Sequence, residues 1–336
     1  MTGPRRMVRR LREKLRAAYA VYQSDPERLR PGTRLYEKRT REETQHYSGV
    51  YSTGEAEAHL LEPAPAAWEE IQRRSAALLR RATGMDLTEH IVSRLTTRPE
   101  ARFLSLGSGA GGVEMVFARE APGTQFLCLD LNQELLRVGR DAARNEGLNM
   151  RFEPADLNTV NLPRAEFDLV FCHASLHHVL ELERLAEQVK QALRPGGEWI
   201  VVDIITRSGY RMWPETRKVV RPLFRTLPAQ FRLNHTAYLP ERRIDREIWE
   251  GDTRAAGMEC IRSGDILPVL RSRFRQVAFA GYQSIARRFL DTMYGPNYDL
   301  SQPLDARLLD WIWELDCHYV ASGALRPESF FGVYAP

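Results

Sequence analysis

The residues best suited to chemistry are a glycine-rich loop and a carboxylate that follows it at a fixed spacing. Gly107, Gly109 and Gly111 stand in the run LGSGAGG, after a short apolar segment and before a predicted helix. Glycines at such a place permit a sharp turn and let a ligand approach the backbone closely. Asp130 ends the next apolar segment, about 20 residues on, where a carboxylate can accept hydrogen bonds from both ribose hydroxyls. This spacing predicts a site for a nucleoside-containing cofactor.

A further carboxylate and three histidines extend the pattern. Asp156 follows the third predicted strand in PADLN, where it could accept a hydrogen bond from an adenine amino group. His173, His177 and His178 stand in CHASLHHV, at the edge where open α/β sheets bind ligands. A histidine can remove a proton from a hydroxyl or amine near neutral pH. We therefore name His177 and His178 as candidate catalytic bases, with packing or helix entry as their alternative role.

The elements that must position these residues alternate along the middle of the chain. Apolar segments typical of strands alternate with helical segments, and this rhythm implies βαβ units. It predicts an α/β fold, Rossmann-like and doubly wound, with a mostly parallel sheet. The predicted strands are 103–106, 126–129, 151–153, 167–171 and 199–205, and the predicted helices are 112–119, 133–146 and 182–193.

At this point the chain resembles the class I S-adenosylmethionine-dependent methyltransferases. The runs LSLGSGAGG, LCLDLNQELL, PADLN, FDLVFCHASLHHV and LRPGGEWIVVD follow in the order of that family and lie within residues 101–206. The resemblance implies S-adenosyl-L-methionine as cofactor, with its methionine part beside the glycine loop, its ribose at Asp130 and its adenine at Asp156. His173 is expected to border the adenosine through its backbone. The implied cofactor-binding residues are Gly107, Ser108, Gly109, Gly111, Asp130, Leu131, Asp156, Leu157 and His173.

The methyl acceptor is predicted from the segments around this core. Residues 207–244 and 284–326 are rich in aromatic side chains and stand where family members build lids, which favours a small, partly apolar acceptor methylated on oxygen or nitrogen. The tetrad of Asn or Asp, two prolines and an aromatic that marks methylation of nucleic-acid amino groups is replaced by CHAS, which argues against a nucleic acid. Residues 250–277 resemble a segment of bacterial methyltransferases that act in glycan or specialised-metabolite pathways. This resemblance implies a role in bacterial small-molecule metabolism.

Three alternative functions stay open. An RNA methyltransferase would use the same core on a larger acceptor. A nicotinamide-dependent oxidoreductase would need hydride-transfer residues such as a Tyr-x-x-x-Lys pair, and the chain lacks that pattern. A protein that binds the cofactor without turning it over would use its basic N-terminal helix, predicted over residues 7–22, as a docking element. We favour a simpler role for that helix, in which it packs on the core.

The flanking regions complete the predicted organisation. Residues 1–95 are expected to form a helical extension and lid, 96–206 the cofactor-binding core, and 207–336 the substrate-lid insertions and last strands. Within the extension, the polar stretch 36–59 has a weak pattern and is predicted as a mobile lid, and 68–95 as a helix. The C-terminal part is expected to contain helices at 246–257 and 304–322 and strands at 276–280 and 330–334.

Composition bounds the remaining possibilities. Hydrophobic residues are 43% and charged residues 27% of the 336, an ordinary balance for a globular protein. The net charge of +4 is concentrated at the N-terminus, and the rest of the chain is not basic enough to indicate nucleic-acid binding. The four cysteines lack metal or redox spacing, so we expect no metal and a reduced, cytoplasmic setting. No membrane span is expected, and the oligomeric state is left open.

Overall fold

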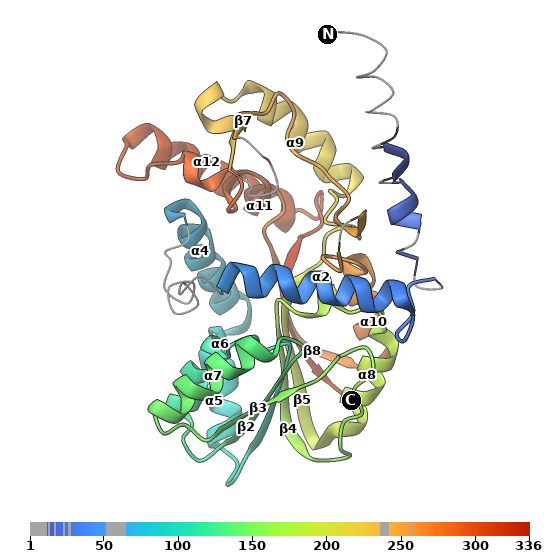
Figure 1. Ribbon diagram of the computed structural model, residues 1–336. Coiled ribbons are helices and arrows are strands. Elements are labelled where there is room, and N and C mark those ends of the chain that lie inside the picture. Colours follow the sequence, from blue (N-terminus) through green and yellow to red (C-terminus); the bar gives the residue numbers. More distant parts are fainter. Residues whose placement is uncertain are drawn as a thin grey trace.

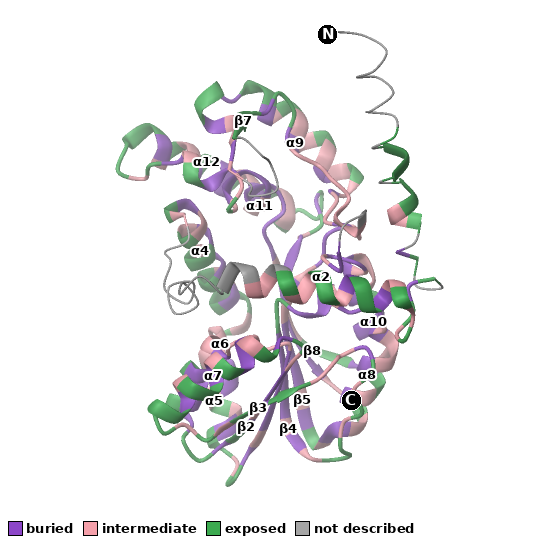
Figure 2. Ribbon diagram, in the orientation of Figure 1, coloured by how far each residue is buried: buried purple, intermediate pink, exposed green. Residues whose placement is uncertain are grey.

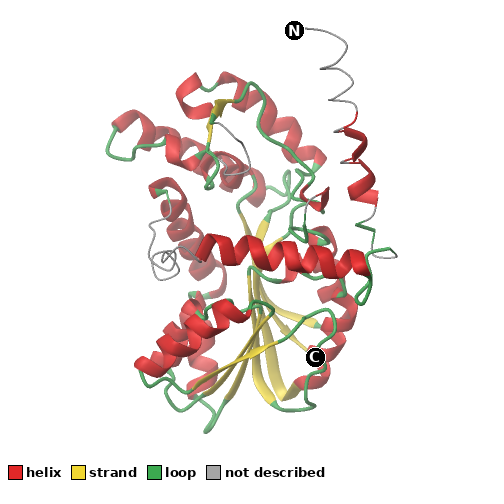
Figure 3. Ribbon diagram, viewed as in Figure 1, coloured by secondary structure: helices red, strands yellow, loops and turns green. Residues whose placement is uncertain are grey.

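A seven-stranded sheet forms the centre of the part of the chain that the structure describes (Figures 1 and 3). The computed structural model describes residues 12–336 apart from 13, 17, 23, 26, 27, 52–64, 236–241 and 256. The strand order is β3-β2-β1-β4-β5-β9-β8; β1 to β5 run parallel, and β9 is antiparallel to both neighbours. The strands are β1 (Arg102–Leu106), β2 (Gln125–Asp130), β3 (Met150–Pro154), β4 (Phe167–His173), β5 (Leu193–Ile204), β8 (Arg275–Tyr282) and β9 (Ser329–Ala335). The predicted fold class is confirmed.

Helices cover both faces of the sheet, which explains why its strands are almost continuously apolar. Figure 2 shows these strands as largely buried. On one face, Ile91 and Phe117 pack in a single apolar cluster with the sheet, and Leu136 packs in a neighbouring one. On the other face, Leu185 and Val269 pack together with residues of the sheet in a further apolar cluster. The helices involved are α5 (Leu87–Thr96), α6 (Gly112–Glu120), α7 (Gln133–Asn145), α8 (Leu182–Ala192) and α10 (Ile266–Arg273).

A second group of helices lies beyond the carboxyl edge of the parallel strands. They share an apolar core of their own, which includes Phe224, Phe289 and Trp313. Helix α2 (Arg34–Tyr51) crosses the molecule between this helical cap and the sheet (Figure 1). The cap comprises α4 (Ala66–Thr83), α9 (Pro214–Thr226), α11 (Ile285–Leu290) and α12 (Pro303–Ala321), with the short hairpin of β6 (Leu233–Asn234) and β7 (Arg243–Ile244).

Two predictions of local structure are corrected, and the conformation of a third segment is now defined. The stretch predicted as a mobile lid is helical up to Tyr51, and the rest of it lies outside the described residues. The helix predicted over 68–95 is two helices, because Gly84 ends the first in a left-handed conformation and Asp86 caps the second. The helix predicted over 246–257 is an irregular segment with one 3₁₀ turn; there the Asp252 side chain accepts a hydrogen bond from the Arg254 amide and competes with helix formation.

The N-terminal helix was expected to pack on the core, but the apolar side chains of its described part do not do so. Leu15 and Tyr19 are each 61% exposed, and Tyr22 is 53% exposed, so its apolar stripe faces solvent where it is described. The first residues of that predicted helix lie outside the described part of the chain. Among the described residues, no helix combines the length and the apolar character that crossing a membrane requires.

Helix α7 holds the glycine loop in place through one glycine of its own. A Cβ atom at Gly139 would lie 2.4 Å from the carbonyl oxygen of Ala110 and 2.6 Å from the Phe152 ring. Backbone atoms cannot yield as a flexible side chain can, so the helix can approach the loop this closely only at a glycine.

Substitution of this glycine should therefore disturb the loop. Gly139→Ala is expected to lower the free energy of unfolding by about 1–3 kcal/mol, the usual effect of overpacking. Gly123→Ala is the matched control, because nothing lies within 4 Å of the Cβ it would add. Urea unfolding of both variants measures the difference, and equal stability would contradict this account of the contact.

Candidate active site

The glycine loop combines two tightly packed positions with one open position. A Cβ atom at Gly107 would lie 2.4 Å from the Ser175 Cβ, and at Gly111 it would lie 2.8 Å from the Phe152 ring. Gly109 has a φ of +54°, and a Cβ atom there would meet only the Leu135 side chain, at an ordinary contact distance of 3.7 Å; its backbone lines a cavity. A ligand can reach the backbone there.

Asp130 lies beside this loop at the end of β2. Its two carboxylate oxygens accept hydrogen bonds from the amides of Gly109 and Asn132, each at 2.8 Å. Burial raises the pKa of the Asp130 carboxyl, and the two amide bonds oppose that rise. A carboxylate offers about four acceptor positions, so two stay available for hydroxyl groups of a ligand. Asn132 also caps α7.

Asp156 is held by a residue that the sequence analysis did not single out. The Tyr36 hydroxyl, on α2, donates to both oxygens of Asp156 at 2.7 and 2.9 Å. The amide of Asn158 donates to the same carboxylate at 2.8 Å, and its side chain donates to the Tyr36 oxygen. Burial, together with the bond to Asp156, raises the pKa of Tyr36. Little of the Asp156 carboxylate is therefore left for an adenine, which would share it with Tyr36.

These groups line one cavity of about 270 Å³. Helix α2 covers it with a single face, since its lining residues recur at helical spacing. From α2 these are Tyr36, Thr40, Glu43, Thr44 and Tyr47; from the loops at the carboxyl ends of the strands they include Gly107, Ser108, Gly109, Asp130, Leu131, Asn132, Asp156, Leu157, Asn158, Ala174, Ser175 and His178. Of the predicted cofactor-binding residues, Gly111 and His173 are not in the lining.

His173 ends β4 with an exposed ring that stacks on Phe171 at 6.2 Å between centroids. The two residues after it, Ala174 and Ser175, line the cavity in its place. The backbone after β4 thus approaches the cavity as expected, but one residue later than predicted.

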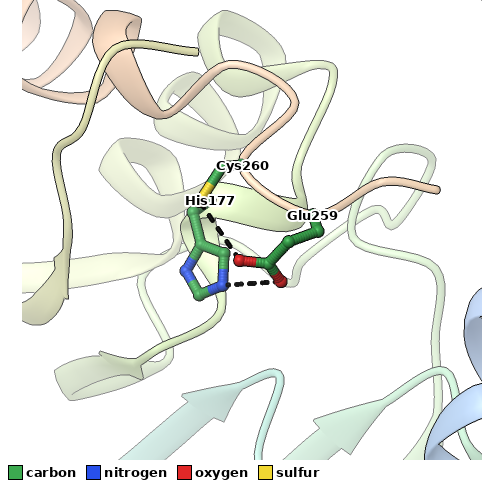
Figure 4. A group of neighbouring side chains, drawn as sticks. All are labelled: His177, Glu259 and Cys260. Atoms are coloured by element: carbon green, nitrogen blue, oxygen red, sulfur yellow. Dashed lines mark hydrogen bonds and ion pairs between the residues drawn. The ribbon is translucent and has the colours of Figure 1, made fainter. Parts of the chain in front are cut away.

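His177 is buried between the carboxylates of Asp203 and Glu259, of which Figure 4 shows Glu259. Its Nδ1 lies 2.6 Å from an Asp203 oxygen, and its Nε2 lies 3.6 Å from Glu259. Burial by itself lowers the pKa of His177, but the two carboxylates outweigh it and raise the pKa to about 10. A ring that is already protonated at neutral pH cannot accept a proton, and His177 does not line the cavity. This geometry counts against the prediction that His177 is a general base.

His178 is partly exposed and does line the cavity. Its Nδ1 lies 2.7 Å from Glu43 of α2, and its Nε2 lies 3.5 Å from Glu259 and 3.4 Å from the Tyr47 hydroxyl. Burial alone would raise the pKa of Glu43, but contact with His178 lowers it overall. Of the two predicted bases, His178 is the one that can meet a ligand.

Two overlapping groups of side chains have the composition of a metal site. His177, Glu259 and Cys260 form one, and Glu43, His178 and Glu259 form the other; within each group the candidate ligand atoms lie within 4.8 Å of one another. Burial raises the pKa of the Cys260 thiol, which disfavours the thiolate that metals bind. The protonated His177 already compensates Asp203 and Glu259. Sequence spacing could not reveal these groups, because their members come from three distant segments.

The comparisons with known proteins agree with this geometry. Residues 103–197 match the model of a methyltransferase domain. The chain carries a class I S-adenosylmethionine-dependent methyltransferase domain. The resemblance noted in the sequence is confirmed, and S-adenosylmethionine is the cofactor of this domain.

The curated relatives share that domain and little more. A ubiquinone/menaquinone biosynthesis C-methyltransferase of Hydrogenovibrio crunogenus is 30% identical over 117 residues, which are 34% of this chain and 46% of the relative. The Bordetella avium protein of the same name is 28% identical over 113 residues, or 33% of this chain and 44% of the relative. The chain thus spans less than half the length of these relatives.

Similar solved structures are more distant in sequence. A S-adenosylmethionine-dependent methyltransferase from Mesorhizobium loti has a TM-score of 0.40 at 20% identity, covering 74% of this chain and 97% of that one. The PH0226 protein from Pyrococcus horikoshii has a TM-score of 0.40 at 16% identity, covering 74% of this chain and 88% of that one.

Loss of the Asp130 carboxylate should weaken cofactor binding. Asp130→Ala is expected to cost on the order of 1.5–3 kcal/mol in affinity for S-adenosylhomocysteine, the value of hydrogen bonds to a charged group. Asp141→Ala is the control, since that carboxylate is half exposed and pairs only with surface arginines. Calorimetry should also detect no binding of NAD. Unchanged affinity in Asp130→Ala would refute this role.

Helix α2 should become more protected when the cavity is filled. Its polar inner face meets the core mainly through side-chain hydrogen bonds and ion contacts, so ligand contacts should stabilise it. Hydrogen exchange over residues 36–51 is expected to slow with S-adenosylhomocysteine, whereas the amides of α8, on the far face of the sheet, should exchange as before. Equal exchange of α2 in both states would show that it is not a lid.

Proposed function

We propose that this chain transfers a methyl group from S-adenosylmethionine to a small molecule, at an oxygen or a nitrogen. The observation that carries this proposal is the covered cavity, in which the glycine loop, Asp130 and Asp156 meet His178 under α2. The loop backbone from Gly107 to Gly109 would hold the methionine part, Asp130 the ribose, and Asp156 with Tyr36 the adenine. Leu131 and Leu157 supply apolar contact. The cofactor supplies an activated methyl group when bound.

The side chains of this protein have the task of aligning the acceptor and removing its proton. His178 can take a proton from an acceptor O–H or N–H, because its ring borders the cavity between Glu43 and Glu259. The contact of its Nδ1 with Glu43 holds the ring in place. His177 acts as a positioning residue, since its ring lies 4.1 Å from that of His178 and is anchored on Asp203.

The cover over the cavity supports a small acceptor rather than a nucleic acid. Arg39 of α2 is buried, and its guanidinium donates to Ser24 and to the carbonyl oxygens of Ala20, Arg254 and Gly257. The helix is thereby tied down across the site, and it excludes water from the reacting groups.

The four cysteines are all free, which suits a reducing compartment such as the cytoplasm.

Methylation of carbon is the second candidate reaction. It is favoured by the names of the curated relatives, which are C-methyltransferases of ubiquinone and menaquinone biosynthesis. His178 would serve this reaction too, because an aromatic ring must lose a proton when its carbon is methylated. The position of the label in the product separates the two reactions.

Incubation with methyl-labelled S-adenosylmethionine and a metabolite extract should label one or a few small molecules. The labelled product is expected to be an ether, ester or methylamine under the first reaction and a C-methyl compound under the second. Asp130→Ala is the control that should lose the labelling. If the wild type binds the cofactor product but labels nothing, while added RNA becomes labelled, the acceptor is an RNA.

The two histidines should respond differently to substitution. His178→Ala is expected to lower turnover by roughly 10²–10⁴-fold with little change in cofactor affinity. His177→Asn should instead destabilise the fold by about 3–5 kcal/mol, because Asp203 and Glu259 would lose their buried counter-charge. Turnover on the labelled acceptor and thermal unfolding measure both effects. Full turnover in His178→Ala would mean that transfer proceeds by alignment alone.

A further inference from the structure

Two neighbouring arginines on α11 differ in how their charges are compensated. Arg288 is buried, and its Nε lies 2.6 Å from the buried carboxylate of Glu328. Arg287 has no carboxylate oxygen within 4.0 Å among the described residues. Its Nη1 donates to the Ser329 hydroxyl at 3.3 Å, and its buried Nε has no hydrogen-bond partner. Arg287 is thus a cation with unused donors.

The surroundings of Arg287 are aromatic. The carbon atom of its guanidinium lies 5.5 Å from the ring centroids of both Trp68 and Tyr210. The Tyr210 hydroxyl donates to Asp291, whose carboxyl has its pKa raised by burial. Arg287, Tyr210, Trp68 and Asp291 are all partly exposed, so a ligand can reach this group of side chains. Asp291 acts on the Arg287 charge without forming a close ion pair, so the guanidinium keeps donors that an anion can bind.

The Arg287 side chain lies at the same edge of the sheet as the cofactor cavity. Ser329 begins β9 and pairs with Ile204 at the carboxyl end of β5. The adjacent strand β4 leads into Ala174 and Ser175, which line the cavity. Two strand spacings, roughly 10 Å, therefore separate the end of β4 from that of β9. An acceptor of moderate size can span this distance.

Backbone strain gathers around the same place. Ala174, Tyr210, Cys260 and Gln283 have φ values between 51° and 57°, a conformation that side chains other than glycine disfavour. Ala174 follows β4, Gln283 follows β8, and the Gly209 amide next to Tyr210 donates to the Cys260 carbonyl at 2.7 Å. Strain of this kind persists where the surrounding structure imposes it, which is common at binding sites.

We propose that Arg287 binds an anionic group, a carboxylate or phosphate, of the methyl acceptor, while Trp68 and Tyr210 pack against its apolar part. This inference rests on the proposed function, because it assigns the far end of the acceptor whose other end lies at the transferred methyl. A planar guanidinium can donate two parallel hydrogen bonds to such a group. Nearby Asp291 limits the charge that the site accepts and favours a compact anion over a polyanion.

The test uses three probes of similar shape on the full chain loaded with S-adenosylhomocysteine: benzoate, phenyl phosphate and benzamide. Binding is measured by calorimetry in low-salt buffer without other multivalent anions. At least one anionic probe should bind the wild type at least tenfold more tightly than neutral benzamide. Benzoate and phenyl phosphate distinguish a carboxylate site from a phosphate site.

Variants then assign the preference to one side chain. Arg287→Gln should abolish the preference for the anion, a loss of roughly 10- to 100-fold, and Arg287→Lys should retain part of it. Arg326→Gln is the matched control, because Arg326 also lies over a tryptophan, Trp213, but is exposed and paired with Glu215. It should bind the probes as the wild type does. Unchanged melting temperature and S-adenosylhomocysteine affinity in Arg287→Gln would show that the variant is folded.

Several results would overturn the proposal. These are equal binding of anionic and neutral probes by the wild type, no detectable binding of either anion, or a preference that survives in Arg287→Gln. Cofactor binding and transfer of the labelled methyl are measured separately in the wild type. The proposed function can therefore fail while the anion site stands, and the anion site can fail in an active methyltransferase.

Discussion

The architecture of the site depends on the buried carboxylate of Asp203 near the end of β5. It accepts hydrogen bonds from the amides of Ser175, Leu176 and Ile204 and binds the His177 ring. Burial alone would raise the pKa of Asp203, but contact with His177 lowers it overall. The carboxylate therefore stays charged and holds in place the turn after β4, which forms one wall of the cofactor cavity. A neutral residue could not satisfy so many donors at once.

A series of charged contacts connects Asp203 with the segments that cover the cavity. Asp203 contacts His177, His177 lies near Glu259, and both Glu259 and Glu43 lie near His178. Acids and histidines thus alternate from β5, through the irregular segment before α10, to helix α2. Because each member compensates its neighbours, the sheet, the segment and the lid helix can come together without an isolated buried charge. Arg287 lies outside this chain of contacts, and the carboxylate that acts on its charge, Asp291, forms no close ion pair with it.

Features that depend on neighbouring residues in the sequence could be predicted, whereas features that depend on distant segments could not. The glycine loop and Asp130 could be identified because the ligand-binding turn of this fold requires glycines and a carboxylate at a regular spacing. Tyr36 was missed because the face that α2 turns toward the cavity also carries Thr40, Glu43 and Thr44, so the sequence shows no apolar stripe there. Glu259 was missed for a different reason: it lies two residues after the end of the helix predicted over 246–257, and its partners lie some 80 or more than 200 residues earlier in the chain.

By itself, the sequence determined the alternating α/β core, the cofactor class and the order of the cofactor-binding turns. These follow from local periodicity and from short motifs whose parts are close in the chain. Only the tertiary structure decided which histidine meets the cavity and which is locked between carboxylates, because the two are adjacent and identical in type. It also decided that Arg288 pairs with a buried carboxylate, whereas Arg287 forms no ion pair within 4.0 Å among the described residues. Burial and charge compensation depend on segments that meet only after folding, and no local pattern records them.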